Sequence, residues 1–341
     1  MERNDILTGV LGGLGVIRRR KSGLTKRSND GPKIVILGAG AVGSTFAYSL
    51  LIRGLAAQIA IVDVNRDRAE GEVMDLNHGL PFAYPTRIWA GDYSDCKDAD
   101  IVVIAVDKGQ KIEQSRLELA QGNFQIMKEL IPNITRYNKN CILLVVTNPL
   151  DVMTYVALKL SGFPKSRVIG SGTALDTARL RYLLGEYLQV DPRNVHAYII
   201  GEHGDSEVPV WSLANVAGIK LRDYCPLCKV PYNIEDFNRL FSKVKNAGYD
   251  IIKRKGRTFY AVALAMTKIV ESILRNENAV LTVSSYLQEF HGVNGICLSV
   301  PTVLNRNGVR ETIEIPLDKK ETEDFQESAA IIKNVADSLG L

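Results

Sequence analysis

The chain has 341 residues, of which 46% are hydrophobic, and its net charge at neutral pH is +4. This length suffices for two domains, or one large α/β unit, around a sizeable core. No apolar run reaches the roughly 18 to 20 residues that a membrane-spanning helix needs, so we expect no membrane span.

The basic excess is concentrated at the N-terminus. Residues 1–33 hold eight Lys/Arg against three acidic residues, which leaves 34 basic and 35 acidic residues for the remainder. A nearly neutral body gives no indication of a nucleic-acid groove. We interpret residues 1–32 as a basic, flexible extension; a targeting or membrane-surface segment is the alternative.

Five cysteines, an odd number, do not form a disulfide framework in a chain of this size. A reducing, cytoplasmic location fits this cysteine usage best. Cys225 and Cys228 have CxxC spacing, but no second pair of ligands and no nearby His complete a zinc site. We therefore read them as two thiols in a loop and expect no metal.

The first half of the chain predicts a parallel sheet. A strand at 33–37 is followed at once by a glycine turn and a helix over 41–51. Three further runs are apolar on both faces, which is typical of parallel strands covered by helices on each side. They lie at 59–64, 100–106 and 141–147. Residues 33–170 therefore predict a doubly wound α/β domain.

The second half predicts an α+β domain over residues 171–341. It opens with a helix over 175–188 whose leucines form one buried stripe. "VHAYII", residues 195–200, reads as a strand. More antiparallel sheet is expected near 208–220 and 296–304, and long helices near 235–254, 258–276 and 320–338.

A GxGxxG motif, formed by Gly38, Gly40 and Gly43, lies between the first strand and the first helix. Gly38 permits a tight turn, Gly40 lets the backbone approach a pyrophosphate, and Gly43 allows close helix packing. Asp63, 20 residues after Gly43, suits the adenosine ribose and would repel a 2′-phosphate. This context predicts a Rossmann domain that binds NAD rather than NADP. The alternative is a glycine-rich turn with a surface aspartate.

Hydride transfer to or from nicotinamide requires a partner that moves a proton on oxygen, and histidine suits this near neutral pH. His203 lies in the polar, glycine-containing loop "GEHGDS". Asp176 is the candidate carboxylate that orients the imidazole. Arg179, at i+3 from Asp176, could clamp a substrate carboxylate. Taken alone, Asp176 and Arg179 would read as a surface ion pair.

These residues belong to motifs that resemble the L-lactate dehydrogenases of the bacterial type: "GAGAVG", "VDVNRDRAEGEVMDLNHG", "TNPLD", "GSGTALDTARLR" and "GEHGDSEVPVW". The resemblance, which runs from about Lys33 to the C-terminus, implies that His203 donates and accepts the proton. It also places Asn148 and Thr258 at the substrate. The coenzyme-lining residues it implies are Val42, Asp63, Arg68, Tyr93, Val146, Thr147, Asn148 and Ser171.

The resemblance also implies a mobile loop after the strand at 100–106, from which Arg116 would polarise the substrate carbonyl. Gln110 takes the position where malate dehydrogenases carry Arg, which favours pyruvate over oxaloacetate because a second carboxylate would stay unpaired. The chain departs from the family's "TAGA" stretch by reading Ala-Val-Asp107-Lys108, so Asp107 could oppose the pyrophosphate and Lys108 offset it.

His196 precedes His203 by seven residues on the predicted strand, roughly 15 to 20 Å away at about 3.3 Å per residue. It therefore cannot share the active site. Arg181 points about 200° around its helix from Arg179. By resemblance to bacterial enzymes that respond to fructose 1,6-bisphosphate, Arg181 and His196 would bind this effector at an interface of a homotetramer. An ordinary interface arginine with a buried histidine is the alternative.

The sequence thus predicts an NAD-dependent L-lactate dehydrogenase that interconverts pyruvate and (S)-lactate. The nearer alternative, a malate or other 2-hydroxy acid dehydrogenase, is disfavoured by Gln110. A non-catalytic NAD-binding scaffold is disfavoured by the presence of His203, Asp176, Arg179 and Arg116 together.

Overall fold

The computed structural model describes residues 31–107 and 116–341, without the side chains of residues 116 and 117. Most of the predicted N-terminal extension therefore lies outside the described residues. The same holds for Lys108, for Gln110 and for the side chain of Arg116. Gly31–Leu341 forms one compact unit. The predicted division of this unit after residue 170 stays a prediction.

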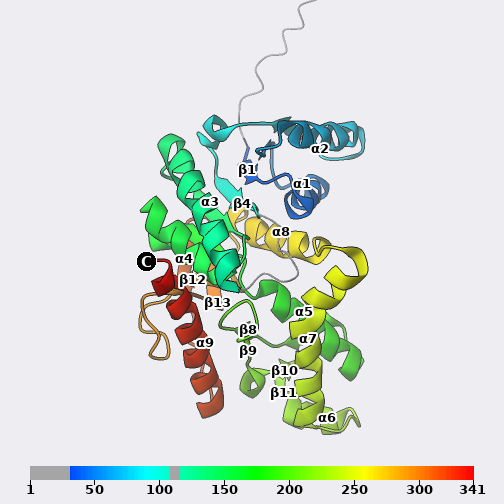
Figure 1. Ribbon diagram of the computed structural model, residues 1–341. Coiled ribbons are helices and arrows are strands. Elements are labelled where there is room, and N and C mark those ends of the chain that lie inside the picture. Colours follow the sequence, from blue (N-terminus) through cyan, green and yellow to red (C-terminus); the bar gives the residue numbers. More distant parts are fainter. Residues whose placement is uncertain (1–30, 108–115) are drawn as a thin grey trace, which may run out of the picture. The chain divides into compact units, whose positions relative to one another are not determined.

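A nine-stranded sheet runs through the unit in the order β14-β13-β12-β6-β5-β4-β1-β2-β3. Figure 1 labels its strands β1, β4, β12 and β13 and the helices around them. The strands are β1 (Lys33–Leu37), β2 (Gln58–Val62), β3 (Arg87–Ala90), β4 (Ile101–Ile104), β5 (Ile142–Val145), β6 (Val168–Gly170), β12 (Ala279–Tyr286), β13 (Cys297–Asn305) and β14 (Gly308–Thr312). Strands β1 to β6 pair in parallel, whereas β12, β13 and β14 add an antiparallel extension. This arrangement confirms the predicted α/β class with a Rossmann half.

Helices cover both faces of the parallel strands. Val35 and Leu37 pack into one core, whereas Ile34 and Ile36 of the same strand pack into the other, which is why all four of these residues are apolar. The first core is covered by α3 (Arg116–Tyr137), α4 (Leu150–Ser161) and α9 (Lys319–Ser338). The second core is covered by α1 (Ala41–Arg53), α2 (Arg66–His78) and α8 (Tyr260–Leu274).

A third, smaller core lies in the second half of the chain. Its helices are α5 (Ala174–Leu188), α6 (Leu221–Leu227) and α7 (Ile234–Lys255). The same part of the chain forms five short strands: β7 (Val195–His196), β8 (Ile199–Ile200), β9 (Val208–Pro209), β10 (Asn215–Val216) and β11 (Ile219–Lys220). The predicted single strand over 195–200 is therefore wrong. Its first part pairs with β10 and its second part with β9, in two different sheets.

The CxxC pair also differs from the prediction. Cys225 lies inside α6 and is buried, and Cys228 caps the end of that helix and is exposed, so the pair does not lie in a loop. All five cysteines are free thiols.

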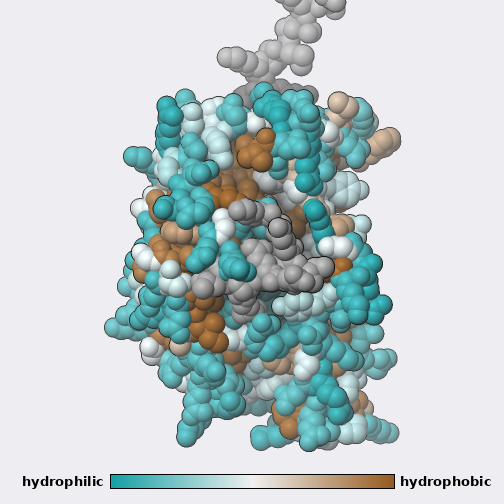
Figure 2. All heavy atoms as spheres, in the orientation of Figure 1, coloured by the Kyte–Doolittle hydropathy of each residue, from teal (hydrophilic) through white to brown (hydrophobic). Residues whose placement is uncertain are grey.

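The face seen in Figure 2 is largely hydrophilic, with hydrophobic residues gathered in separate places. Among the helices of residues 31–107 and 116–341, none combines the length and the apolar character that a membrane crossing requires.

Candidate active site

The glycine turn between β1 and α1 has the geometry that a bound dinucleotide requires. Gly38 has φ of +110°, and a Cβ at this residue would lie 2.5 Å from the Ala105 carbonyl oxygen, so only glycine fits. A Cβ on Gly43 would overlap the Gly38 carbonyl oxygen. Gly40, in contrast, has no atom within 4 Å of a Cβ position and begins α1 without a side-chain cap. Open space therefore adjoins the uncapped amides, which fits a pyrophosphate.

Asp63 is fixed at the end of β2, beside this turn. Its Oδ2 accepts a hydrogen bond from the Ala39 N–H at 2.7 Å, and its Oδ1 accepts one from the Asn65 N–H at 2.9 Å. These two bonds hold the carboxylate at the same edge of the sheet as the glycine turn. The residues present therefore fit the adenosine ribose of NAD at this place.

The other predicted coenzyme residues follow the carboxyl ends of neighbouring strands or begin the adjoining helices. Val42 and Arg68 lie in the first turns of α1 and α2, and Arg68 is exposed. Tyr93 opens a short 3-10 helix and is partly buried, which raises the pKa of its hydroxyl. Residues 146–148 follow β5, and Ser171 follows β6. Because the parallel strands end at one edge, these segments gather along the same side of the sheet.

His203, Asp176 and Arg179 are brought together. His203 Nδ1 lies 2.5 Å from Asp176 Oδ2, and Arg179 Nη1 donates to Asp176 Oδ1 at 2.9 Å. The Asp176 side chain is only 3% exposed, whereas those of Arg179 and His203 are 17% and 28% exposed. Asp176 thus lies beneath two cationic or ionisable groups that reach the surface of the site.

The topology explains this meeting. Strand β6 ends at the same edge of the sheet as β1 and β2 and leads through residues 171–173 into α5, which places Asp176 in the first turn of that helix. The His203 loop reaches the same place because Gly201 pairs with Ser299 of β13. Residues 27 apart in sequence therefore meet beside the edge of the sheet where the glycine turn and Asp63 lie.

The charges of the pair are mutually stabilised. Burial disfavours the charged form of His203, but attraction to Asp176 and the hydrogen bond with it outweigh that effect and raise the pKa of the imidazole to about 9. Burial likewise opposes the Asp176 carboxylate, yet His203 and Arg179 together lower its pKa. The described geometry therefore favours an imidazolium beside a carboxylate at neutral pH.

Asp151 is a site residue that the sequence reasoning missed, although it ends the motif "TNPLD". It is 1% exposed, its Oδ2 accepts the His203 backbone N–H at 2.7 Å, and its Oδ1 accepts from Ser299 Oγ at 3.2 Å. Burial is the largest effect on its pKa, which rises to about 6. Asp151 lies in the first turn of α4, and no local pattern in the sequence places that turn beside His203, 52 residues away.

Among the described residues, no hydrogen bond or ion pair joins Asn148, Thr258, Arg181 or His196 to this cluster. Asn148 is exposed, and its carbonyl oxygen accepts from Asn123 Nδ2 at 2.6 Å. Thr258 lies between α7 and α8 and is partly buried. Arg181 Nε donates to the Ala197 carbonyl oxygen at 3.1 Å, on a different side of α5 from Arg179, and His196 is exposed beside that carbonyl.

Comparisons with known proteins agree with this architecture. Residues 32–170 match the lactate/malate dehydrogenase NAD binding domain, and residues 173–339 match the lactate/malate dehydrogenase alpha/beta C-terminal domain. The chain is 52% identical over 309 residues to the L-lactate dehydrogenase of Acetivibrio thermocellus, which covers 91% of this chain and 98% of the relative. It is 50% identical over 309 residues to a probable L-lactate dehydrogenase of Schizosaccharomyces pombe, covering 91% and 93%.

The solved structures give the same result at the level of the fold. The minor L-lactate dehydrogenase from Enterococcus mundtii, in its ligand-bound form, superposes with a TM-score of 0.87 at 40% identity, over 90% of this chain and 98% of that one. The predicted family, fold and NAD cofactor are thereby confirmed. The chain belongs to the lactate/malate dehydrogenase family and is an NAD-dependent oxidoreductase.

Proposed function

We propose that the protein is an L-lactate dehydrogenase in which His203 transfers the proton between solvent and substrate. The observation that carries the proposal is the contact of His203 Nδ1 with Asp176 Oδ2 at 2.5 Å. Because Asp176 holds Nδ1, Nε2 is the ring nitrogen that faces substrate oxygen. A pKa of about 9 keeps the ring protonated at neutral pH, ready to act as an acid in pyruvate reduction.

Arg179 serves in this proposal as the anchor of the substrate carboxylate. Its guanidinium carries five N–H donors in a fixed plane, and Nη1 is engaged by Asp176 Oδ1. That contact fixes the plane while 17% of the side chain stays exposed toward the site. A carboxylate can then accept two parallel hydrogen bonds from Arg179, an arrangement that lysine cannot reproduce.

NAD would be held by Gly38, Gly40, Gly43 and Asp63, with Val42, Arg68, Tyr93, residues 146–148 and Ser171 lining the site. When bound, the reduced coenzyme supplies the hydride that reaches the carbonyl carbon. Arg116 and Gln110 are assigned to carbonyl polarisation and substrate choice, and Asn148 and Thr258 to substrate contact, on the strength of the family resemblance. The L-lactate dehydrogenase names of the relatives support pyruvate as the substrate.

Steady-state kinetics with pyruvate and with oxaloacetate test the substrate assignment. We expect kcat/KM for pyruvate to exceed that for oxaloacetate at least tenfold, since a neutral Gln110 leaves the second carboxylate of oxaloacetate without a partner. The opposite ratio would identify a malate dehydrogenase. NADH binding without turnover of either acid would instead support the scaffold alternative.

We also propose that fructose 1,6-bisphosphate activates the enzyme as a homotetramer through Arg181 and His196. Arg181 Nε donates to the carbonyl oxygen of Ala197, the residue after His196, so the Arg181 guanidinium lies beside the backbone from which the His196 side chain starts. Burial lowers the pKa of Arg181, so an anionic ligand beside it would stabilise its charged form. Exposed apolar side chains on the packed helices α1 and α8 support association: Tyr48, Ile52, Tyr260 and Leu264.

Pyruvate saturation curves with and without the bisphosphate test the effector proposal. We expect the effector to lower the half-saturating pyruvate concentration several-fold in the wild type and to have no effect on Arg181→Gln. Superimposable wild-type curves, together with a sedimentation profile that the bisphosphate does not change, would overturn it.

The free state of all five thiols supports a cytoplasmic location.

A further inference from the structure

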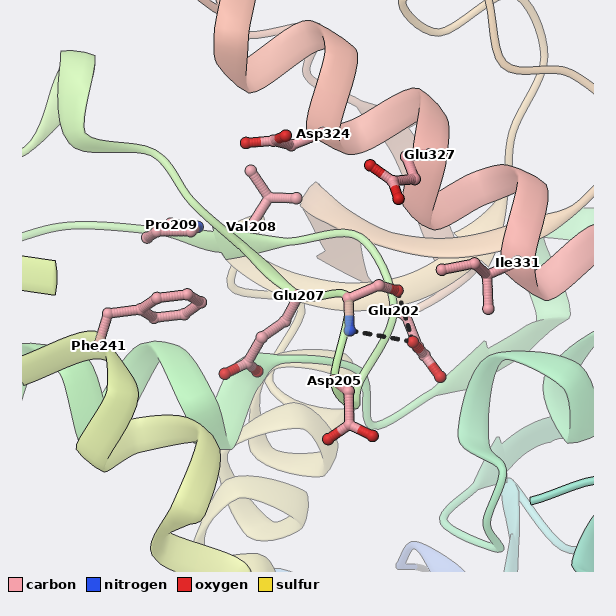
Figure 3. A pocket seen from close by; sticks show the side chains of 10 residues that line it. Glu202, Asp205, Glu207, Val208, Pro209, Phe241, Asp324, Glu327 and Ile331 are labelled. Atoms are coloured by element: carbon pink, nitrogen blue, oxygen red, sulfur yellow. Dashed lines mark hydrogen bonds between the residues drawn. The ribbon is translucent and has the colours of Figure 1, made fainter. Parts of the chain in front are cut away.

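A closed ring of hydrogen bonds joins the loop that carries His203 to the C-terminal helix α9. The Glu202 N–H donates to Ser328 Oγ at 2.8 Å, Ser328 Oγ lies 3.0 Å from Ser206 Oγ, and Ser206 Oγ donates to Glu202 Oε2 at 2.5 Å. Figure 3 shows α9 passing over this loop, with dashed lines that end on Glu202. His203 follows Glu202 directly and lies in the segment 202–206, whose two end residues the ring joins.

The direction of each hydrogen bond follows from the chemistry of the groups. A carboxylate oxygen only accepts, so the Ser206 hydroxyl proton points to Glu202. Ser206 Oγ must then accept the hydroxyl proton of Ser328, and Ser328 Oγ is left to accept the Glu202 N–H. Every donor in the ring points the same way around, an arrangement in which each bond polarises and strengthens the next.

The ring is buried and closely packed. Ser328 is 0% exposed and Glu202 is 4% exposed. A Cβ on Gly201, which directly precedes Glu202, would lie 2.8 Å from Ser328 Oγ. Removing the Ser328 hydroxyl would therefore leave the Glu202 N–H without its buried acceptor and Ser206 Oγ without its donor, and the backbone would move to satisfy them.

The three attachments of the loop act on different atoms. Asp176 holds the imidazole ring of His203 and Asp151 holds its backbone N–H. The ring instead holds the Glu202 N–H through Ser328 Oγ, and Glu202 Oε2, which belongs to the ring, also accepts the Ser206 backbone N–H at 3.2 Å. The backbone is thereby fixed on both sides of His203. We propose that Ser328 is a positioning residue, which sets the orientation of His203 from helix α9. This inference rests on the proposed role of His203 in proton transfer.

Hydrogen exchange in the protein without coenzyme tests the geometry independently of activity. In Ser328→Ala, we expect amides in a peptide covering residues 201–207 to exchange at least tenfold faster than in the wild type, while a peptide covering β5 stays unchanged. The matched control is Ser338→Ala, at the exposed end of the same helix, where the hydroxyl bonds only to the helix carbonyl of Val335 among the described residues. Unchanged exchange in 201–207 would overturn the proposal.

Kinetics test the consequence for catalysis. We expect Ser328→Ala to lower kcat for pyruvate about tenfold, to leave the affinity for NADH unchanged, and to raise the primary isotope effect with deuterated NADH. A partly unfolded preparation would lower kcat without changing the isotope effect. A kcat and isotope effect equal to those of Ser338→Ala would refute the positioning role, even if exchange in the loop were faster.

A double mutant tests whether Ser328 acts through the hydrogen-bonded ring or independently of Ser206. Because Ser206 and Ser328 belong to one network, Ser206→Ala combined with Ser328→Ala should cost no more in kcat than the larger single effect. A loss of kcat in the double variant equal to the product of the two single losses would contradict a shared role. If the wild type itself does not turn over pyruvate, the proposed function fails, whereas the exchange experiment still decides whether Ser328 fixes the loop.

Discussion

At the scale of single residues, the site depends on one buried carboxylate that serves two cations. Asp176 accepts from both His203 and Arg179, so one group orients both the proposed proton carrier and the proposed substrate anchor. Sequence patterns could predict this trio because His203 lies in a polar loop and because Asp176 and Arg179 are one helical turn apart. Asp151 and Ser328 were not predictable, since their contacts with the loop arise from segments 52 and 126 residues away.

Asp176→Asn should change the pH profile of pyruvate reduction. Without the carboxylate, the pKa of His203 falls from about 9 toward the ordinary value of 6.5, so the imidazolium is lost earlier as the pH rises. We expect the alkaline limb of kcat/KM to move down by at least one pH unit and kcat to fall by a factor of about 10² to 10⁴.

Rates measured between pH 6 and 10 at saturating NADH check this prediction. Glu186→Gln, an exposed carboxylate on the same helix, serves as the control. An Asp176→Asn profile with the wild-type alkaline limb would show that another group limits the reaction.

At the scale of elements, continuous apolar runs predicted the parallel strands β1, β2, β4 and β5, because a strand covered by helices is apolar on both faces. The short strands β3 and β6 carry no such run and were not predicted. The same reasoning failed at 195–200, where the apolar pattern continues while the chain passes from one small sheet to another. Hydrophobicity reports burial but not the partner of a strand. The pairing of β12 with β6 likewise depends on a contact between residues more than 100 positions apart, which no local pattern records.

The packing of α1 against the glycine turn gives a prediction for Gly43→Ala. The added Cβ would overlap the Gly38 carbonyl oxygen, and because this is a backbone atom it cannot avoid the overlap by a rotamer change. We expect the unfolding free energy to fall by about 1 to 3 kcal/mol and the affinity for NADH to fall with it. Gly248→Ala is the matched control on α7, because nothing lies within 4 Å of its Cβ position.

Thermal denaturation with and without NADH compares the two variants. Gly248→Ala should be neutral or gain up to about 1 kcal/mol from the better helix propensity of alanine. Equal melting temperatures for both variants would mean that the turn can relax around a methyl group.

At the scale of the whole molecule, stability should depend on the protonation of Glu207. This side chain is 6% exposed, and its Oε1 has no hydrogen-bond partner among the described residues. Burial first, and then repulsion by Asp176, raise its pKa to about 9 from 4.5. The folded protein thus holds a proton that the unfolded chain releases, so this stabilising contribution is complete below about pH 4.5 and is lost progressively as the pH rises toward 9.

Glu207→Gln keeps the neutral form at every pH. We expect the variant to gain about 1 to 3 kcal/mol relative to the wild type between pH 5.5 and 7.5, from about 1.4 kcal/mol per pH unit for one fully shifted group. Denaturant unfolding at the two pH values measures the gain. Glu207 and Glu327 line one surface pocket (Figure 3), and Glu327 is exposed, so Glu327→Gln is the control. A gain that does not grow with pH would contradict the buried acid.

The junction of β6 with β12 has a consequence for how this protein can be recombined with its relatives. The two family models meet between residues 170 and 173, yet β6 is paired with β5 on one side and β12 on the other. A Cβ on Gly170 would overlap Thr154 Oγ1 and lie 2.8 Å from Ser284 Cβ, so the three residues fit only as a set. A chimera spliced at this boundary would inherit Thr154 and Gly170 from one parent and Ser284 from the other, and it should fold only when both parents carry the same small side chains there.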